Sequence, residues 1–392
     1  MAALTWLFAF LLLTSAAAHK HHHGLTIEER SRCLNGKVCA LNKNTVDVFV
    51  VGDTGGLSID LTNTVGAHTT TKVQTRLAVS LAEAAERIAK PDFIINVGDN
   101  IYWNGVDNVN DSRFETLFEE PYADGRLMVP WYMIGGNHDH LGNISAQIEY
   151  SLNKGKWTFP NLFYKASYSF AGGTKTADFI FVDTIVMCGN SVDPDSRSIA
   201  AWLWHSLMNK KALLGPGLKH TSEAPRQWRW LEDQLRNSTA DYIFVSGHYP
   251  IHSVSSHGPL DCLKHKLDPL LRKYNVSAYL AGHDHTLQHF IETKATDTNP
   301  KSTMHYIVSG VGSRIDPSEE NFSENYSKDL LYRYPKYSDL DWHHRTLRTY
   351  LLGRGWGGYV RFAVGVNQTD VFFYAGDEAS LTHKTTILPR AK

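Results

Sequence analysis

The residues most suited to chemistry lie in five short polar strings, which occur in order along the chain. The strings are Gly52-Asp53-Thr54-Gly55, Gly98-Asp99-Asn100-Ile101-Tyr102, Gly135-Gly136-Asn137-His138-Asp139, Ser246-Gly247-His248-Tyr249 and Gly282-His283-Asp284-His285. They offer carboxylate, carboxamide, phenol and imidazole donors, and no thiolate. Such a donor set favours Fe, Mn or Zn over a zinc site of the finger type. The strings are therefore suited to holding a pair of metal ions.

Each string directly follows an apolar run of strand length. The runs are rich in β-branched and aromatic residues: 46–51, 93–97, 131–134, 242–245 and 278–281. Because they show little polar alternation, they are predicted to be strands buried on both faces. The glycines that follow let the backbone turn sharply and approach a ligand closely. Five loops at the ends of adjacent strands would therefore bring their donors together at one edge of a sheet.

The alternative for any single string is ordinary turn chemistry, and Asn137-His138-Asp139 on its own is equally well a polar turn. The occurrence of five strings, each after a predicted strand, favours the metal interpretation. Tyr102 narrows the choice of metal. A phenol has a pKa of about 10, so only a strongly Lewis-acidic ion such as Fe(III) binds it readily as phenolate near neutral pH. The alternative for Tyr102 is a half-buried aromatic residue at a strand end.

With these residues in view, the series resembles the calcineurin-like metallophosphoesterases. Gly98-Asp99-Asn100-Ile101-Tyr102 and Gly247-His248-Tyr249-Pro250 are similar to motifs of the purple acid phosphatases within that superfamily. The similarity is greatest to their small, single-domain, tartrate-resistant animal type, through Gly136–Asn143, Ser145–Ile148 and Cys188–Ser191 among other stretches. It covers residues 48–313 and continues thinly to 389. The fold it implies is an α/β, four-layer α/β/β/α sandwich with two mixed β-sheets.

The resemblance also implies a role for each candidate site residue. The ferric ion would be bound by Asp53, Tyr102 and His285. The divalent ion would be bound by Asn137, His248 and His283, and Asp99 would bridge both ions. That second ion would be Fe(II), with Zn or Mn as alternatives. His138 and His257 would act as catalytic residues that contact the phosphate and assist the leaving group, although His257 could instead be a solvated surface histidine.

The implied activity is that of an acid phosphatase, which hydrolyses phosphate monoesters with a metal-bound hydroxide as the nucleophile. Fe(III) lowers the pKa of bound water, and a protonated imidazole can donate to the leaving oxygen, so we expect an acidic pH optimum. Two alternatives stay open at this point. One is a phosphodiesterase or nucleotidase of the same superfamily, and the other is an iron-binding or transport protein with incidental hydrolysis.

The chain departs from the animal pattern in two respects. Thr54 stands where that pattern has Trp, which predicts a smaller or more polar pocket wall beside Asp53. Two stretches, 192–225 and 314–358, are longer than the family core requires. The first stretch could be an inhibitory loop that an activating protease cuts at Lys210-Lys211, or it could be a packed helix around Trp202 and Trp204.

The remaining features predict an exported enzyme. The chain has 392 residues and a formal net charge of −1, which gives no basic field for a nucleic-acid partner. Residues 1–18 are predicted to be a signal peptide, 19–45 an N-terminal extension and 46–392 a single catalytic domain. The apolar core of the signal peptide is too short to span a membrane and no later run is long enough for an anchor, so we expect a secreted or lysosomal monomer. Seven Asn-x-Ser/Thr sequons agree with that route, whereas the His19–His23 cluster is predicted to be a solvated tail.

The cysteines and the helical periodicity complete the sequence predictions. Four cysteines allow three pairings. Cys188 with Cys262 resembles the disulfide of the family, which leaves Cys33 with Cys39 as a local clasp. Apolar residues at helical spacing predict helices at 70–89, 227–236 and 263–274. Apolar runs at 306–308, 359–364 and 371–374 predict further strands, which would complete the back half of a two-sheet sandwich.

Overall fold

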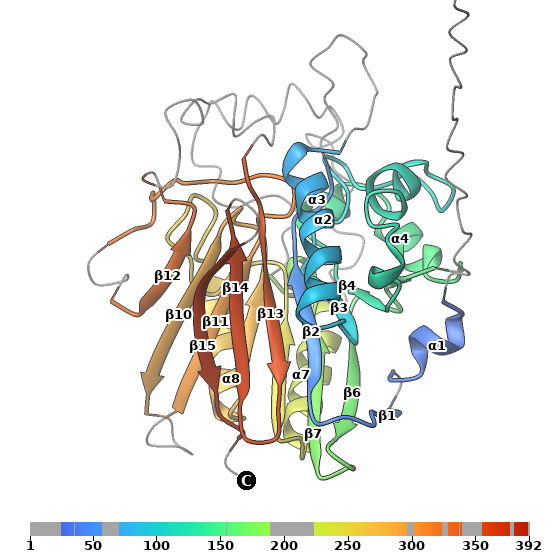
Figure 1. The fold of residues 1–392 in the computed structure, drawn as a ribbon. Helices are drawn as coiled ribbons and strands as arrows, with labels where there is room; N and C mark the ends of the chain where they lie inside the picture. The colour runs from blue at the N-terminus through green and yellow to red at the C-terminus, as the bar shows by residue number, and fades with distance from the viewer. Residues whose placement is uncertain are drawn as a thin grey trace, which may run out of the picture.

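Two mixed β-sheets lie face to face in the computed structural model (Figure 1), which describes residues 25–34, 36–56, 70–153, 155–188, 223–295, 302–323, 328–336, 338, 355–376 and 380–390. Within these residues, one sheet has the order β15 (Ser380–Ile387), β14 (Thr369–Ala375), β13 (Gly358–Val364), β2 (Val46–Val51), β3 (Phe93–Asn96), β4 (Trp131–Met133) and β5 (Trp157–Thr158). The other has the order β1 (Val38–Ala40), β6 (Tyr164–Phe170), β7 (Lys175–Phe181), β8 (Tyr242–Ser246), β9 (Ala278–Ala281), β11 (Ser302–Ser309), β10 (Leu287–Lys294) and β12 (Leu330–Tyr334).

The strands that carry the polar strings form the parallel part of each sheet. β2, β3 and β4 pair in parallel in the first sheet, and β8 pairs in parallel with β9 in the second. Every residue of these strands is buried, as their continuous apolar runs predicted. Parallel strands place their carboxyl ends, and the loops that follow, at the same edge of a sheet.

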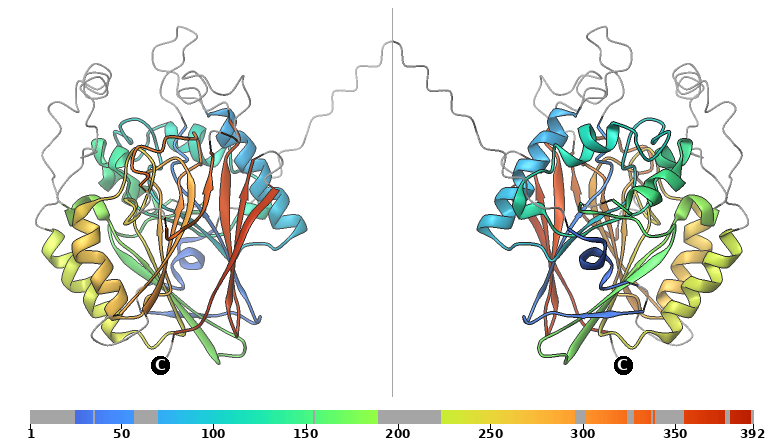
Figure 2. Two further views of the ribbon diagram at one scale, coloured as in Figure 1. Left: turned by 90° about the vertical axis from the view of Figure 1, so that its left-hand side faces the viewer. Right: turned by 90° about the vertical axis from the view of Figure 1, so that its right-hand side faces the viewer.

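Helices cover the outer faces of the sheets and complete the four layers that the family resemblance implied. Figure 2 shows α7 (Glu223–Asn237) and α8 (Asp268–Lys273) outside one sheet, and α2 (Lys72–Arg87) outside the other. α2 begins at Thr71, whose hydroxyl oxygen caps the helix by accepting from the Gln74 N–H. Its buried stripe includes Val73, Leu77 and Leu81, at the spacing that the sequence analysis used.

The remaining helices are short. They are α1 (Ile27–Ser31), α3 (Asn137–Leu141), α4 (Ile144–Tyr150), α5 (Thr184–Cys188), two π-helical turns (Glu115–Glu119 and Leu263–Leu267) and a 3-10 turn (Gly125–Leu127). The helix predicted at 263–274 is therefore a π-helical turn that continues into α8. Those predicted at 70–89 and 227–236 are confirmed, and α7 begins four residues earlier than expected.

Aromatic residues fill the space between the sheets. Phe93 of β3 packs on Tyr168 of β6 and on Phe179 of β7, with ring centroids 4.8 and 4.9 Å apart. These contacts join the two sheets in one core, and pairs of this kind contribute beyond their buried area. The core fixes the sheets relative to each other, so the loops at their edges have defined positions.

Two disulfides tie outer segments to this core. Cys33 is bonded to Cys39 and Cys188 to Cys262, which confirms both expected pairings. The strand β1, which contains Cys39 of the first pair, extends the larger sheet by pairing in parallel with β6.

Several sequence predictions fall on residues outside the described ranges. They are the signal peptide at 1–18, the His19–His23 cluster, the Lys210-Lys211 cleavage point, most of the stretch 192–225, and residues 324–327, 337 and 339–354 of the stretch 314–358. Within the described part of the chain, no helix combines the length and the apolar character needed to cross a membrane.

Candidate metal centre

The five polar strings converge, because loops from the two sheets bond to one another. The Asp53 N–H donates to the Gly98 carbonyl, at 2.9 Å, which joins the loops after β2 and β3. The Gly282 N–H donates to the His248 carbonyl, at 2.9 Å, which joins the loops after β8 and β9. His283 then connects the sheets, since its N–H donates to Asp53 Oδ2 at 3.0 Å. All nine residues predicted for the site are described, and only His257 and His285 are more than slightly exposed.

A first group of donor atoms contains the phenol predicted to bind Fe(III). The Tyr102 hydroxyl lies 3.0 Å from Asp53 Oδ1 and 3.0 Å from His285 Nε2. Asp53 Oδ1 and His285 Nε2 are themselves 3.5 Å apart. Ligands that bind one ion at about 2.0 to 2.2 Å are separated by such distances. This triangle of two oxygens and one nitrogen therefore fits a single ion of the Fe, Mn or Zn class.

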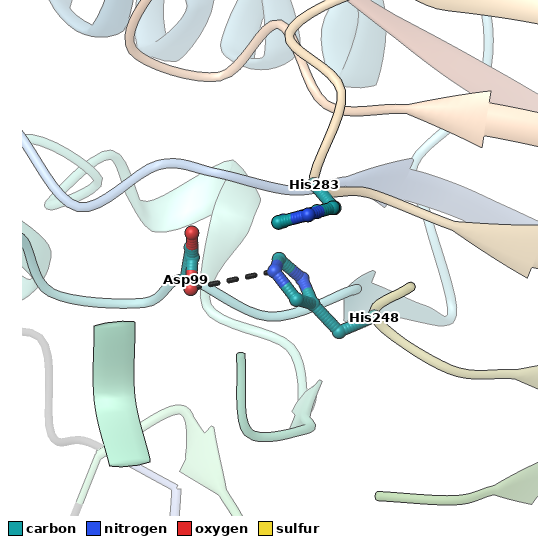
Figure 3. A group of neighbouring side chains, drawn as sticks. All are labelled: Asp99, His248 and His283. Carbon is teal, nitrogen blue, oxygen red and sulfur yellow. Dashed lines mark ion pairs between the residues drawn. The ribbon is translucent and has the colours of Figure 1, made fainter. Parts of the chain in front are cut away.

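A second group lies around His248, which is fully buried. Its Nε2 atom lies 3.0 Å from Asn137 Oδ1 and 3.4 Å from Asp99 Oδ1. Asp99, His248 and His283 each offer one ligand atom, and these atoms lie within 4.8 Å of one another. Figure 3 shows both imidazoles on the same side of the Asp99 carboxylate. This group also fits one ion.

The orientation of His248 is set by the backbone of the neighbouring sheet. Its Nδ1 atom lies 2.9 Å from the Val97 carbonyl, which can only accept a hydrogen bond. Nδ1 therefore carries a proton, which leaves Nε2 as the nitrogen that would bind a metal ion. A ring held this way by a carbonyl is the usual support of a metal-binding histidine.

Three of the candidate ligands have backbone conformations that are unusual for residues other than glycine. Asp53, Asp99 and His283 have φ angles of 57°, 51° and 69°. Such left-handed conformations cost free energy and cluster at functional sites, where the surrounding structure enforces them. Here the hydrogen bonds between loops provide that enforcement.

Glycines allow the loops to approach each other this closely. A Cβ atom on Gly136 would lie 2.1 Å from Asp99 Oδ1, and one on Gly98 would lie 2.6 Å from His248 Nδ1. Both distances are far below van der Waals contact. Gly98 and Gly136 are thus required for packing beside the ligands, in addition to the sharp turn that the sequence indicated.

Burial and the nearby carboxylates shift the pKa values of Tyr102 and His248. Burial, and next the nearby carboxylates Asp53 and Asp99, hold the pKa of Tyr102 well above its ordinary value of 10.0. For His248, burial opposes the charged form, but Asp99 and Asp53 outweigh it and raise the pKa to about 9. A cation that binds here must therefore displace protons from both groups, so metal binding would release protons.

Burial is also the main cause of the shifted pKa values of His285 and Asp53. Burial lowers the pKa of His285 well below its usual range, with Arg314 as the next cause, so its ring stays neutral and able to donate a lone pair. Burial also raises the pKa of Asp53 well above normal, partly because Asp99 lies nearby. A cation placed between two buried carboxylates that repel each other stabilises the ionised form of both.

The two histidines predicted to be catalytic lie beside these groups. His138 places Nδ1 2.7 Å from the Trp103 carbonyl, which leaves Nε2 as the nitrogen nearer Asp99, at 4.0 Å from Oδ2. The His257 ring centroid lies 4.9 Å from that of His283, and the His257 N–H donates to Asp284 Oδ1 at 2.9 Å. Since His257 is partly exposed, it stands at the mouth of the site.

Asp139 is a positioning residue that the sequence analysis passed over as part of a turn. Its carboxylate accepts from the N–H groups of Gly136, Asn100 and Ile101 and from the amide of Gln147, at 2.8 to 3.2 Å. It thereby ties the loop that carries Asp99 to the loop that carries Asn137. Only its short distance from the candidate ligands in the sequence hinted at this role.

The sequence also did not predict the contacts of His140 and Arg314. The His140 Nε2 atom lies 2.7 Å from Asp183 Oδ2, and this buried pair connects α3 to the loop after β7. Arg314 places its guanidinium over the Tyr102 ring. No local pattern marks either contact, because the partners are distant in sequence.

Comparisons with known proteins agree with this geometry. Residues 46–287 match the family model described as calcineurin-like phosphoesterase. The chain is 36% identical to tartrate-resistant acid phosphatase type 5 of Rattus norvegicus, over 71% of this chain and 76% of that protein. It is 38% identical to the Homo sapiens protein of the same name, over 60% of this chain and 65% of that protein.

A solved structure extends the comparison to the fold. The structure titled "GAP50 the anchor in the inner membrane complex of Plasmodium" superposes with a TM-score of 0.63 at 21% identity, covering 89% of this chain and 90% of that chain. At this identity the likeness concerns the fold alone. The family model, which spans most of the chain, and the relatives show that this chain belongs to the calcineurin-like phosphoesterase family.

Proposed function

We propose that the chain is an acid phosphatase that hydrolyses phosphate monoesters at a binuclear metal centre. The observation that carries this proposal is the pair of adjoining donor groups around Tyr102 and His248. The names of the relatives, tartrate-resistant acid phosphatases, support the same activity. The two disulfides fit a secreted or lysosomal location, since such bonds persist in oxidising compartments.

In this proposal the first donor group holds Fe(III) and the second holds a divalent ion. Asp53, Tyr102 and His285 bind the ferric ion, because only a strongly Lewis-acidic cation displaces the proton of a phenol with a raised pKa. Asn137, His248 and His283 bind Fe(II), Zn or Mn, which accept neutral nitrogen and amide oxygen donors. Asp99 would be the ligand that the two ions share. When bound, such a pair of ions would neutralise charge on the phosphoryl group and supply hydroxide below neutral pH.

The histidines beside the donor groups would handle the substrate. His138 presents Nε2 toward the site because the Trp103 carbonyl occupies Nδ1, so that nitrogen can donate to a phosphoryl oxygen. His257, at the mouth of the site, would donate a proton to the leaving oxygen. These roles require protonated imidazoles, so turnover should be favoured at acid pH.

The test combines metal analysis with turnover of para-nitrophenyl phosphate by the purified protein. We expect two transition-metal ions per chain and an acidic optimum. The variant His248→Ala should lose the divalent ion and at least about 100-fold in kcat/KM, because it removes a ligand and leaves its partners unpaired. His265→Ala is the matched control, since His265 is exposed on a helical turn whose contacts lie outside the donor groups. Full activity in protein that contains no transition metal would contradict the proposal.

A comparison of substrates distinguishes the phosphatase from a phosphodiesterase of the same family. We expect para-nitrophenyl phosphate to be hydrolysed with a higher kcat/KM than its bis-aryl diester. The opposite ratio would be compatible with the metal centre, but it would identify phosphate diesters as the substrate class.

A further inference from the structure

The guanidinium group of Arg314 lies at the edge of the proposed ferric site. Arg314 follows β11 in the loop 310–317, and it is only 8% exposed. Its guanidinium carbon lies 4.5 Å from the centre of the Tyr102 ring and 4.3 Å from that of the Trp103 ring. Two aromatic faces therefore fix the position of this cation, as cation–π contacts do for arginine more often than for lysine.

The loop that carries Arg314 is tied to the metal-binding loops on both sides. The Gly312 N–H donates to the Gly52 carbonyl at 3.0 Å, and the Asp316 N–H donates to the His285 carbonyl at 2.8 Å. The Thr71 hydroxyl donates to the Ser313 carbonyl at 2.6 Å. The loop is thus held by main-chain contacts, which makes the guanidinium a preorganised group.

Arg314 lacks the partners that a buried cation normally has. Its Nη2 atom makes a long hydrogen bond to His285 Nε2, at 3.4 Å, and its other polar neighbour is the Tyr102 hydroxyl. Its Nε atom is buried without an acceptor, and among the described residues no carboxylate lies within ion-pair distance of the guanidinium. Burial of a charge without a counter-charge is costly, so this position indicates that an anion is bound during function.

Arg314 needs a bound anion even more when the proposed metal ions are present, and the inference rests on that proposed function. His285 Nε2 is the atom that would bind the ferric ion, so its lone pair could no longer accept from Arg314. The guanidinium would then face the two metal ions, and both of its polar neighbours, Tyr102 and His285, would be ligands of the ferric ion. A tetrahedral oxyanion held by the ions would present oxygens at that place.

We propose that Arg314 binds an oxygen of the phosphoryl group and is a specificity-determining residue for tetrahedral oxyanions. The planar fork of arginine matches phosphate geometry, and it can donate two parallel hydrogen bonds to phosphoryl oxygens. Arg314 adds a fixed positive charge beside the metal ions, and it strengthens the binding of both the substrate and inorganic phosphate.

The test titrates the metal-loaded full-length protein with inorganic phosphate and measures binding by calorimetry. Arg314→Met should bind phosphate roughly 10- to 100-fold more weakly, as expected for the loss of a charge-assisted hydrogen bond. Arg314→Lys should weaken it at least about threefold, since lysine keeps the charge and loses the fork. Arg76→Met is the matched control, because Arg76 also stacks on an indole, at 3.8 Å from the Trp356 ring, and donates to the Gly355 carbonyl.

Metal content and thermal stability of each variant separate phosphate recognition from a structural role. Wild-type phosphate affinity in Arg314→Met, with two metals retained, would overturn the proposal. If Arg314→Met does not fold or loses its metals, Arg314→Lys decides, and wild-type affinity there would overturn it. The proposed function fails separately, if the wild-type protein hydrolyses no phosphate monoester, since calorimetry measures phosphate binding without turnover.

Discussion

An array of three histidines between the two sheets should make the stability of this protein depend on pH. His289 of β10 places Nδ1 2.9 Å from Nε2 of His383 in β15, and Nε2 3.1 Å from Nδ1 of His305 in β11. His289 is fully buried and has no carboxylate among its ring contacts. Each neutral imidazole has one donor and one acceptor, so the array is satisfied when its members are neutral.

Burial keeps these rings neutral in the folded protein. Burial, and next the neighbouring His305 and His383, lower the pKa of His289 to about 2, and burial lowers that of His305 to about 4. Both values lie below the 6.5 that a histidine has when exposed on unfolding. The unfolded state therefore binds more protons at acid pH, so the stabilisation is present above pH 6.5 and is lost as the pH falls toward the folded values.

The size of the effect follows from linkage. Consider a histidine that titrates normally in the unfolded state and stays neutral in the folded state. Its protonation on unfolding lowers the free energy of unfolding by about 2 kcal/mol between pH 7 and pH 5. The variant His289→Gln removes one such group, while its amide can still donate to one neighbour and accept from the other. Its free energy of unfolding should therefore fall by about 2 kcal/mol less than that of the wild type over this range.

Urea unfolding at pH 7 and pH 5, followed by tryptophan fluorescence with disulfides intact, measures this difference. His265→Gln is the control, because His265 is exposed and lies outside the array. It should show the wild-type dependence on pH. The reasoning would be refuted if His289→Gln and the wild type lost the same stability to within about 0.5 kcal/mol, which is well below the expected difference.

Three further predictions concern the metal centre. Tyr102→Phe should abolish any visible charge-transfer absorption, because phenylalanine has no oxygen to bind Fe(III), and an unchanged spectrum of the metal-loaded variant would exclude Tyr102 as a ligand. Asp139→Asn should lower the free energy of unfolding by about 2 to 4 kcal/mol in denaturant titrations, since its carboxylate accepts four N–H donors and a new amide N–H would face some of them; a change below about 0.5 kcal/mol would contradict that role. Gly136→Ala should reduce bound metal, measured by elemental analysis, because its Cβ would lie 2.1 Å from Asp99 Oδ1, and a full complement of two ions would show that the loop can shift.

Much of the metal-binding edge could be predicted from sequence, because its signals are local. Strands β2, β3 and β8 are largely apolar runs, and each is followed within three residues by a glycine and a polar donor. Such a run specifies both the buried strand and the place where it ends. The parallel pairing rule correctly groups the loops after β2, β3 and β4, and those after β8 and β9. The expectation of one edge of one sheet was wrong, because the two groups of loops come from different sheets that lie face to face.

The contacts that surround the ligands could not be predicted in the same way. The Asp139 carboxylate looked like part of a turn, and its four donors became visible only when the loops were placed side by side. Arg314 meets Tyr102 across more than 200 positions of sequence, in a stretch where the family resemblance had become thin. The array around His289 joins strands from different sheets, and no periodicity in one strand marks such a pair.

The claim that two ions share the Asp99 carboxylate is tested most directly by crystals of the purified protein. Anomalous difference maps at the iron edge, and at the edge of any second metal found by elemental analysis, would locate the ions. We predict two peaks about 3.5 to 4 Å apart, one beside Tyr102 and one beside His248, with Asp99 between them. A single peak, or peaks remote from Asp99 in a fully active sample, would contradict the account.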